Sequence, residues 1–78
     1  MRFPMVLVAW IDSTSDDAWD DIEHHQDHGA HTIYSIGFLI QEHPAFITLA
    51  QNIDPEGGVA SMSMRIPTGC IQKVTRLL

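Results

Sequence analysis

The feature that most constrains the fold is a hydrophobic pattern of period two that runs from Thr32 through the rest of the chain. Successive side chains of a β-strand point to opposite faces, so this alternation predicts half-buried strands. Turn-forming residues divide the pattern into segments. We therefore predict four strands in this region, at Thr32–Ile40, Ala45–Ile53, Val59–Ile66 and Ile71–Leu77.

Three turns separate these strands. The proline-containing stretches Gln41–Pro44 and Asp54–Gly58 interrupt the alternation, because proline removes a donor from the strand ladder. Pro67–Gly69 predicts a single tight turn of the 3₁₀ type. Gly37 lies within a strand segment and predicts a bulge or a sharp bend there.

A different pattern precedes Thr32. The continuous apolar run Met5–Ile11 is typical of a strand that is buried on both faces or lies in a tight barrel. Capping residues and acids then predict a helix over Ser15–His28, closed by Gly29. Its short apolar stripe, which includes Trp19 and Ile22, is expected to hold one edge of the core.

The chain is 78 residues long, which predicts one small domain over residues 1–78. The expected fold is mainly β with one short helix, in the order strand, helix, four strands. Five short strands favour a small closed or nearly closed barrel, because closure removes exposed edges. Edge strands that remain, together with so small a core, predict a homo-oligomer.

Charge and composition exclude several classes of protein. Ten acids against four bases give a net charge of −6, which argues against a general binder of nucleic acid or anionic membranes. One cysteine excludes an internal disulfide and a cysteine-based zinc site. The opening run Met1–Ile11 is too short to span a bilayer and lacks a signal-peptide cleavage site, so we expect a cytoplasmic protein.

The charges are distributed unevenly along the chain. Seven of the ten acids fall between Asp12 and Asp27, whereas the last two predicted strands carry no acid and three bases, Arg65, Lys73 and Arg76. The symmetry of a ring would multiply this basic strip into an anion-binding surface. The alternative is an ordinary solvated face.

The end of the first strand offers further candidate ligand-binding residues. Asp12, Ser13 and Trp19 would surround a ligand if strand ends from adjacent subunits meet. The competing interpretation is that Asp12 or Ser13 caps the following helix. Neither residue is followed by the pattern of a nucleophile elbow. We find no coherent catalytic set in the sequence, so we predict no catalytic residues, no cofactor and no enzyme.

A histidine-rich segment is the one candidate metal site. His24 and His28 are spaced to lie on one helix face, and His31 or a nearby aspartate would supply a third ligand. Histidines near a helix C-terminus also complement the helix dipole without any metal. The segment lacks the glutamate between histidines that marks a metal hydrolase, so we assign no metal and keep these three as candidates.

Several short motifs carry a resemblance over nearly the whole chain. They are Trp10–Ser13, Trp19, Ile36–Leu39, Leu49–Ala50 and Ile66–Ile71. The chain resembles a family of small bacteriophage proteins of unknown function with the pattern Trp-x-Asp-Ser, Trp, Gly-Phe-Leu and Ile-Pro-x-x-Cys-Ile. This resemblance brings no activity with it, but it implies synthesis in the cytoplasm of a host bacterium.

The layout of the later strands is also similar to Sm-like and SH3-like small barrels. Gly37–Leu39 matches the Gly-x-Leu of Sm-like ring proteins, and Ile66 to Ile71 keeps the spacing of their Ile-Arg-Gly-x-x-Ile signature. Pro67 and Thr68 replace the Arg-Gly, and the family's Asp and Asn are absent after Gly37–Leu39. Those residues contact RNA bases in the family. The resemblance therefore implies a small barrel and a ring, without its RNA contacts.

Three functional hypotheses follow. The first is a non-enzymatic, oligomeric phage-type protein that inhibits host defence by sequestering a small anionic, nucleotide-like host ligand at subunit interfaces. The second is an Sm-like RNA-binding ring, which we rank lower because of the acidic surplus. The third is an inhibitor whose acidic segment Asp16–Asp27 mimics nucleic-acid charge and binds a host protein.

Overall fold

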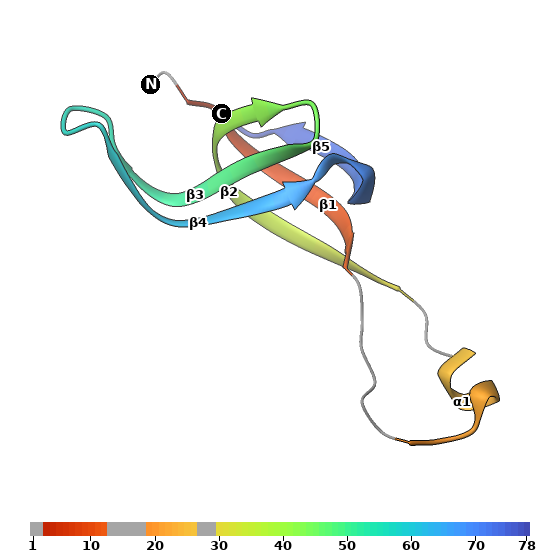
Figure 1. Cartoon of the computed structure of the whole chain (residues 1–78). Coiled ribbons are helices and arrows are strands. Elements are labelled where there is room, and N and C mark those ends of the chain that lie inside the picture. Colours follow the sequence, from red (N-terminus) through yellow and green to blue (C-terminus); the bar gives the residue numbers. More distant parts are fainter. Residues whose placement is uncertain (1–2, 13–18, 27–29) are drawn as a thin grey trace.

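The alternating segments form the strands of a single sheet. The computed structural model describes residues 3–12, 19–26 and 30–78 (Figure 1). The elements are β1 (Met5–Asp12), α1 (Ile22–Gln26), β2 (His31–His43), β3 (Phe46–Asp54), β4 (Val59–Pro67), the 3₁₀ turn η1 (Thr68–Cys70) and β5 (Ile71–Arg76). The predicted order of one strand, one helix and four strands is confirmed, as is the mainly β fold class.

The hairpin between β2 and β3 is tighter than its sequence predicts. The expected turn Gln41–Pro44 is shortened to Pro44 and Ala45, and β2 continues to His43, which pairs with Phe46. The imidazole of His43 closes the turn, because its Nδ1 accepts a hydrogen bond of 3.0 Å from the amide of Ala45. The 3₁₀ turn predicted after β4 is confirmed, displaced by one residue to Thr68–Cys70.

The sheet has two free edges. All neighbouring strands are antiparallel, in the order β4-β3-β2-β1-β5. β4 therefore pairs only with β3, and β5 pairs only with β1. In the described part of the chain no ladder joins β4 to β5, although the strands curl strongly around one side of the sheet (Figure 1).

One face of the curled sheet holds the core. Val6 and Val8 on β1 are buried together with Leu49 on β3 and Ile66 on β4. Directly opposed residues of antiparallel strands lie on the same face. Trp10, Leu39, Ile47 and Ile71 pack around the four buried side chains. The opposite face of the sheet, called the outer face below, carries alternate residues of the same strands.

At both edges, apolar side chains on the core face stay exposed. Met64 pairs with Leu49 across β3 and β4, yet 40% of it is exposed. Val74 pairs with buried Val8 across β1 and β5, yet 45% of it is exposed. Met62 is 69% exposed. The core is thus filled at its centre and incomplete along β4 and β5.

Two backbone positions shape the sheet. A Cβ added at Gly37 would lie 3.0 Å from the carbonyl oxygen of Ala50 and 3.2 Å from the Cβ of Leu49, so β2 and β3 approach closely there. The register irregularity predicted near Gly37 lies further along β2, between Leu39 and Gln41. On β4, Met62 has a φ of 54°, in the left-handed region that side chains rarely adopt.

The segment between β1 and β2 departs from its prediction. Its described part, residues 19–26, is called the arm here, and its helix α1 is shorter than the predicted Ser15–His28. Ser13 and Gly29 lie outside the described residues. Trp19 is 102% exposed and Ile22 is 76% exposed, so the expectation that this apolar stripe holds an edge of the core is wrong. The arm extends beyond the end of the sheet (Figure 1), and no residue of α1 is buried in the described structure.

Candidate functional site

The residues predicted at the end of β1 do not converge within one chain. Asp12 ends β1 and pairs with His31 on β2. Ser13 lies outside the described residues. Trp19 belongs to the arm, and its full exposure means that no described residue covers its ring. The described part of the chain therefore forms no packed site that combines Asp12 with Trp19.

The three bases lie at opposite edges of the sheet. Arg65 is on β4, whereas Lys73 and Arg76 are on β5, so β3, β2 and β1 lie between them. They do not form one strip within a single chain. No side-chain carboxylate of the described residues lies within ion-pair distance of any of the three, and Nε of Arg76 donates a hydrogen bond of 3.3 Å to the backbone oxygen of Leu78. The charges of Arg65 and Lys73 are therefore available to an external anion.

Arg65 has the most ordered surroundings of the three. Its guanidinium lies over the ring of Phe46, 5.0 Å from the centroid, and the same ring stacks on His43 with centroids 4.5 Å apart and an interplanar angle of 16°. Thr48 pairs with Arg65 on one side and with Gln41 on the other. The Thr48 hydroxyl donates a hydrogen bond of 3.0 Å to Oε1 of Gln41.

Sequence reasoning found Arg65 but missed its neighbours. His43 and Phe46 flank the two-residue turn of a hairpin, and residues at such positions are paired directly across the two strands. A predicted two-residue turn would have indicated that His43 and Phe46 are paired across the hairpin. The sequence instead predicts a longer turn at Gln41–Pro44, and this prediction leaves Gln41 and His43 out of the strand.

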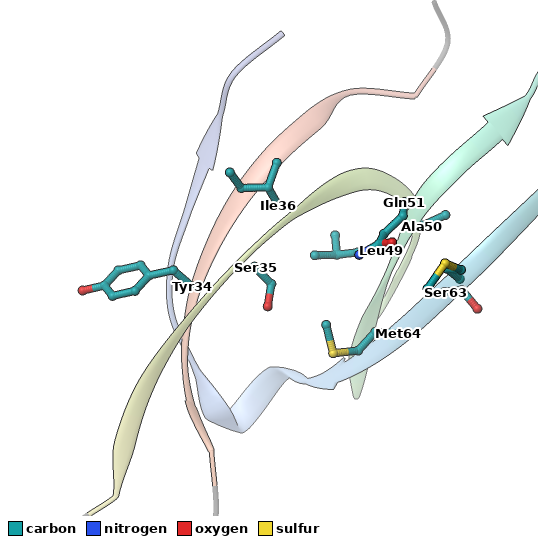
Figure 2. A pocket seen from close by; sticks show the side chains of 9 residues that line it. Tyr34, Ser35, Ile36, Leu49, Ala50, Gln51, Ser63 and Met64 are labelled. Atoms are coloured by element: carbon teal, nitrogen blue, oxygen red, sulfur yellow. The ribbon is translucent and has the colours of Figure 1, made fainter.

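An open groove with a volume of about 380 Å³ crosses β2, β3 and β4. Figure 2 shows the side chains of Leu49 and Met64 in the space beside Ser35, while Tyr34 points away to the other side. No charged residue lines this groove. It is the uncovered end of the core, and its neutral lining gives it no means of selecting an anion.

The candidate metal ligands are only partly described. His24 places Nδ1 3.7 Å from a carboxylate oxygen of Asp20, one helical turn away. His31 begins β2, and His28 lies outside the described residues. Within residues 3–12, 19–26 and 30–78, no three side chains of metal-ligating type form a cluster. No helix in those ranges has the length and apolar character needed to cross a membrane.

The chain was also compared with known proteins. No protein family matches it, and neither a curated protein nor a solved structure shows significant similarity to it. The functional argument therefore rests on the geometry of the sheet, its free edges and its unpaired cations.

Proposed function

We propose that the chain is a non-enzymatic binding protein that assembles into a homo-oligomer through its free sheet edges and holds a small anionic, nucleotide-like molecule at the subunit interfaces. The resemblance to small phage proteins supports the further proposal that this activity belongs to an infected bacterial cell, where capture of such a molecule would blunt a host defence signal. The observation that carries the proposal is the pair of unfinished edges, β4 and β5, each of which bears a cation, Arg65 or Lys73, that forms no ion pair with the described residues.

Exposed strand edges normally carry protective features, because their free amides and carbonyls pair readily with another strand. Here Met64 and Val74 expose apolar surface on the core face at the two edges. These exposed apolar side chains at both free edges support association with further copies.

Pairing of β4 from one subunit with β5 from the next would also collect the basic residues. Arg65 pairs with Thr48, and Lys73 pairs with Ala9, so both lie on the outer face. A sheet that continues between subunits would place Arg65 beside Lys73 of the next copy. Such a head-to-tail contact closes into a ring when its rotation is suitable. In this proposal the closed, Sm-like barrel architecture is completed between chains.

Native mass spectrometry of the protein purified from bacterial cells tests the proposal, since it measures subunit number and retained ligand together. We expect a closed oligomer that carries a few hundred daltons, on the order of one nucleotide, per site. Val74→Glu places a charge at the β5 edge and should give monomers. Ile36→Glu alters an exposed residue of central strand β2 and should leave the oligomer intact. A wild-type monomer without added mass would contradict the proposal.

The arm supports a second candidate function. Asp20, Asp21 and Glu23 are exposed beside exposed Trp19 and Ile22, a combination of acids and apolar groups suited to a basic protein surface. An inhibitor of this kind would bind a purified basic host protein through the arm. Trp19→Ala should then abolish that complex while leaving oligomerisation and anion binding unchanged.

A further inference from the structure

We infer that the outer face at the β2–β3–β4 junction carries a phosphate-binding site formed by Arg65, Gln41 and His43. This inference rests on the proposed capture of an anion and specifies the ligand group and the residues that hold it. Three of the residues involved, Gln41, His43 and Phe46, are absent from the sequence-based site.

The first argument is the orientation of the donors. Oε1 of Gln41 already accepts the hydroxyl of Thr48, so the amide NH₂ of Gln41 is left to donate elsewhere. Nδ1 of His43 already accepts the amide of Ala45, so the proton of the neutral ring is on Nε2. In both side chains the acceptor is occupied within the protein and the donor is free.

The second argument is that the site is held in place before a ligand arrives. Thr48, which anchors Gln41, is only 6% exposed, and Phe46 lies against both the guanidinium of Arg65 and the ring of His43. Stacking leaves the edge of a guanidinium, with its N–H groups, free to donate. Donors that are already positioned lose less conformational entropy on binding.

The third argument is the shared face of the sheet. Gln41, Thr48 and Arg65 form one row across β2, β3 and β4, which spans about 10 Å at the usual strand spacing. His43 and Phe46 form the neighbouring pair on this face. Glu42 pairs with Ile47, which packs against the core, so its carboxylate lies on the opposite face.

These properties specify a phosphate group. A guanidinium donates two parallel hydrogen bonds to a phosphate, and two neutral donors remain for its other oxygens. A carboxylate offers only two oxygens and would leave donors unused. The ligand is therefore the terminal phosphate of a small nucleotide-like molecule.

Isothermal titration calorimetry at fixed ionic strength tests the site with three probes, inorganic phosphate, adenosine monophosphate and adenosine. We expect the monophosphate to bind at least about tenfold more tightly than adenosine and to be displaced by phosphate. Equal affinities for monophosphate and adenosine would overturn the inference. An oligoribonucleotide that binds far more tightly than the monophosphate, with a steep salt dependence, would overturn the assignment to a small ligand.

Substitutions then assign the contacts. Arg65→Lys keeps the charge but loses the planar fork and should weaken the monophosphate by about tenfold. Gln41→Ala should weaken it several-fold, on the order of one hydrogen bond to a charged group. Gln72→Ala is the matched control, because exposed Gln72 on β5 also accepts a threonine hydroxyl, that of Thr32, at 3.5 Å. If Gln41→Ala and Gln72→Ala bind the monophosphate equally, Gln41 is not part of a site.

The same titration on Val74→Glu separates this inference from the proposed function. The site lies within one chain, so a folded monomeric variant should still bind the monophosphate. A wild-type protein that binds the monophosphate while it is itself a monomer would overturn the ring and leave the site. A folded wild-type oligomer that binds neither phosphate nor the monophosphate would contradict the phosphate-binding site. It would still agree with the proposed ring.

Discussion

Two tryptophans, Trp10 in the sheet and Trp19 in the arm, have opposite surroundings. Trp10 packs against the core, and its Nε1–H donates a hydrogen bond of 3.0 Å to the hydroxyl of Ser35. Trp19 is fully exposed. In this chain the tryptophan on a strand paired on both sides packs against the core, whereas the tryptophan of the arm, which has no paired strand beside it in the described structure, does not.

The helix of the arm lacks such a neighbour. Acids in its early turns and a short apolar stripe are consistent with a helix, yet short helices are marginal in water unless they pack on a surface. Only Ile22–Gln26 is helical in the described residues. The sheet residues, by contrast, are ordered by ladders on both sides of β1, β2 and β3.

The largest difference between the two regions should come from a pair of isoleucine truncations. Ile66→Ala removes a fully buried side chain and should lower the free energy of unfolding by about 2–5 kcal/mol. Ile22→Ala in the arm should change it by less than about 0.5 kcal/mol. Urea denaturation at one protein concentration measures both. A large effect of Ile22→Ala would show that another chain covers the arm.

A pair of glycine substitutions gives the next largest effect. Gly37→Ala places a Cβ 3.0 Å from the carbonyl of Ala50 and should destabilise the sheet by about 1–3 kcal/mol. Gly69→Ala meets no atom within 4 Å and should be close to neutral. Thermal unfolding followed by circular dichroism compares them. Equal melting temperatures for the two variants would mean that β2 and β3 separate easily at this point.

The smallest effect concerns the tryptophans themselves. Trp10→Phe keeps an aromatic ring but loses the donor to Ser35 and should destabilise the protein by about 1 kcal/mol. Trp19→Phe should leave the free energy of unfolding unchanged. Intrinsic fluorescence of each variant during unfolding follows the remaining tryptophan alone. Because Trp19 is fully exposed, its emission should not shift during unfolding, and a shift would contradict that exposure.

Much of the sheet could be predicted from the sequence because strand periodicity is local. Val59 to Ile66 alternates cleanly, and β4 begins at the predicted residue. The turn at Gln41–Pro44 was too long in the prediction, because the stacking of His43 on Phe46 and its bond to Ala45 depend on contacts across the hairpin. Whether β4 and β5 pair is likewise a property of the folded sheet, or of several chains, and no local pattern encodes it.

The candidate site could be predicted only in part. The last two strands contain no acid, and this indicates that Arg65 is available to an anion. In the described structure Arg65 forms no ion pair. The separation of Arg65 from Lys73 by three strands could not be predicted, because neighbours in sequence order, β4 and β5, lie at opposite edges. The roles of Gln41 and His43 depend on which of their atoms are already occupied, which only the folded structure reveals.

The left-handed backbone of Met62 has a consequence for how chains can add to β4. A residue in that conformation turns its amide and carbonyl out of line with the ladder, so it divides the free edge into two parts. An incoming strand can pair continuously only along residues 63–67, a stretch comparable in length to the six residues of β5. In the proposed oligomer, Met62 would thereby set the register of one added strand and prevent the long, flat pairing that leads to fibres.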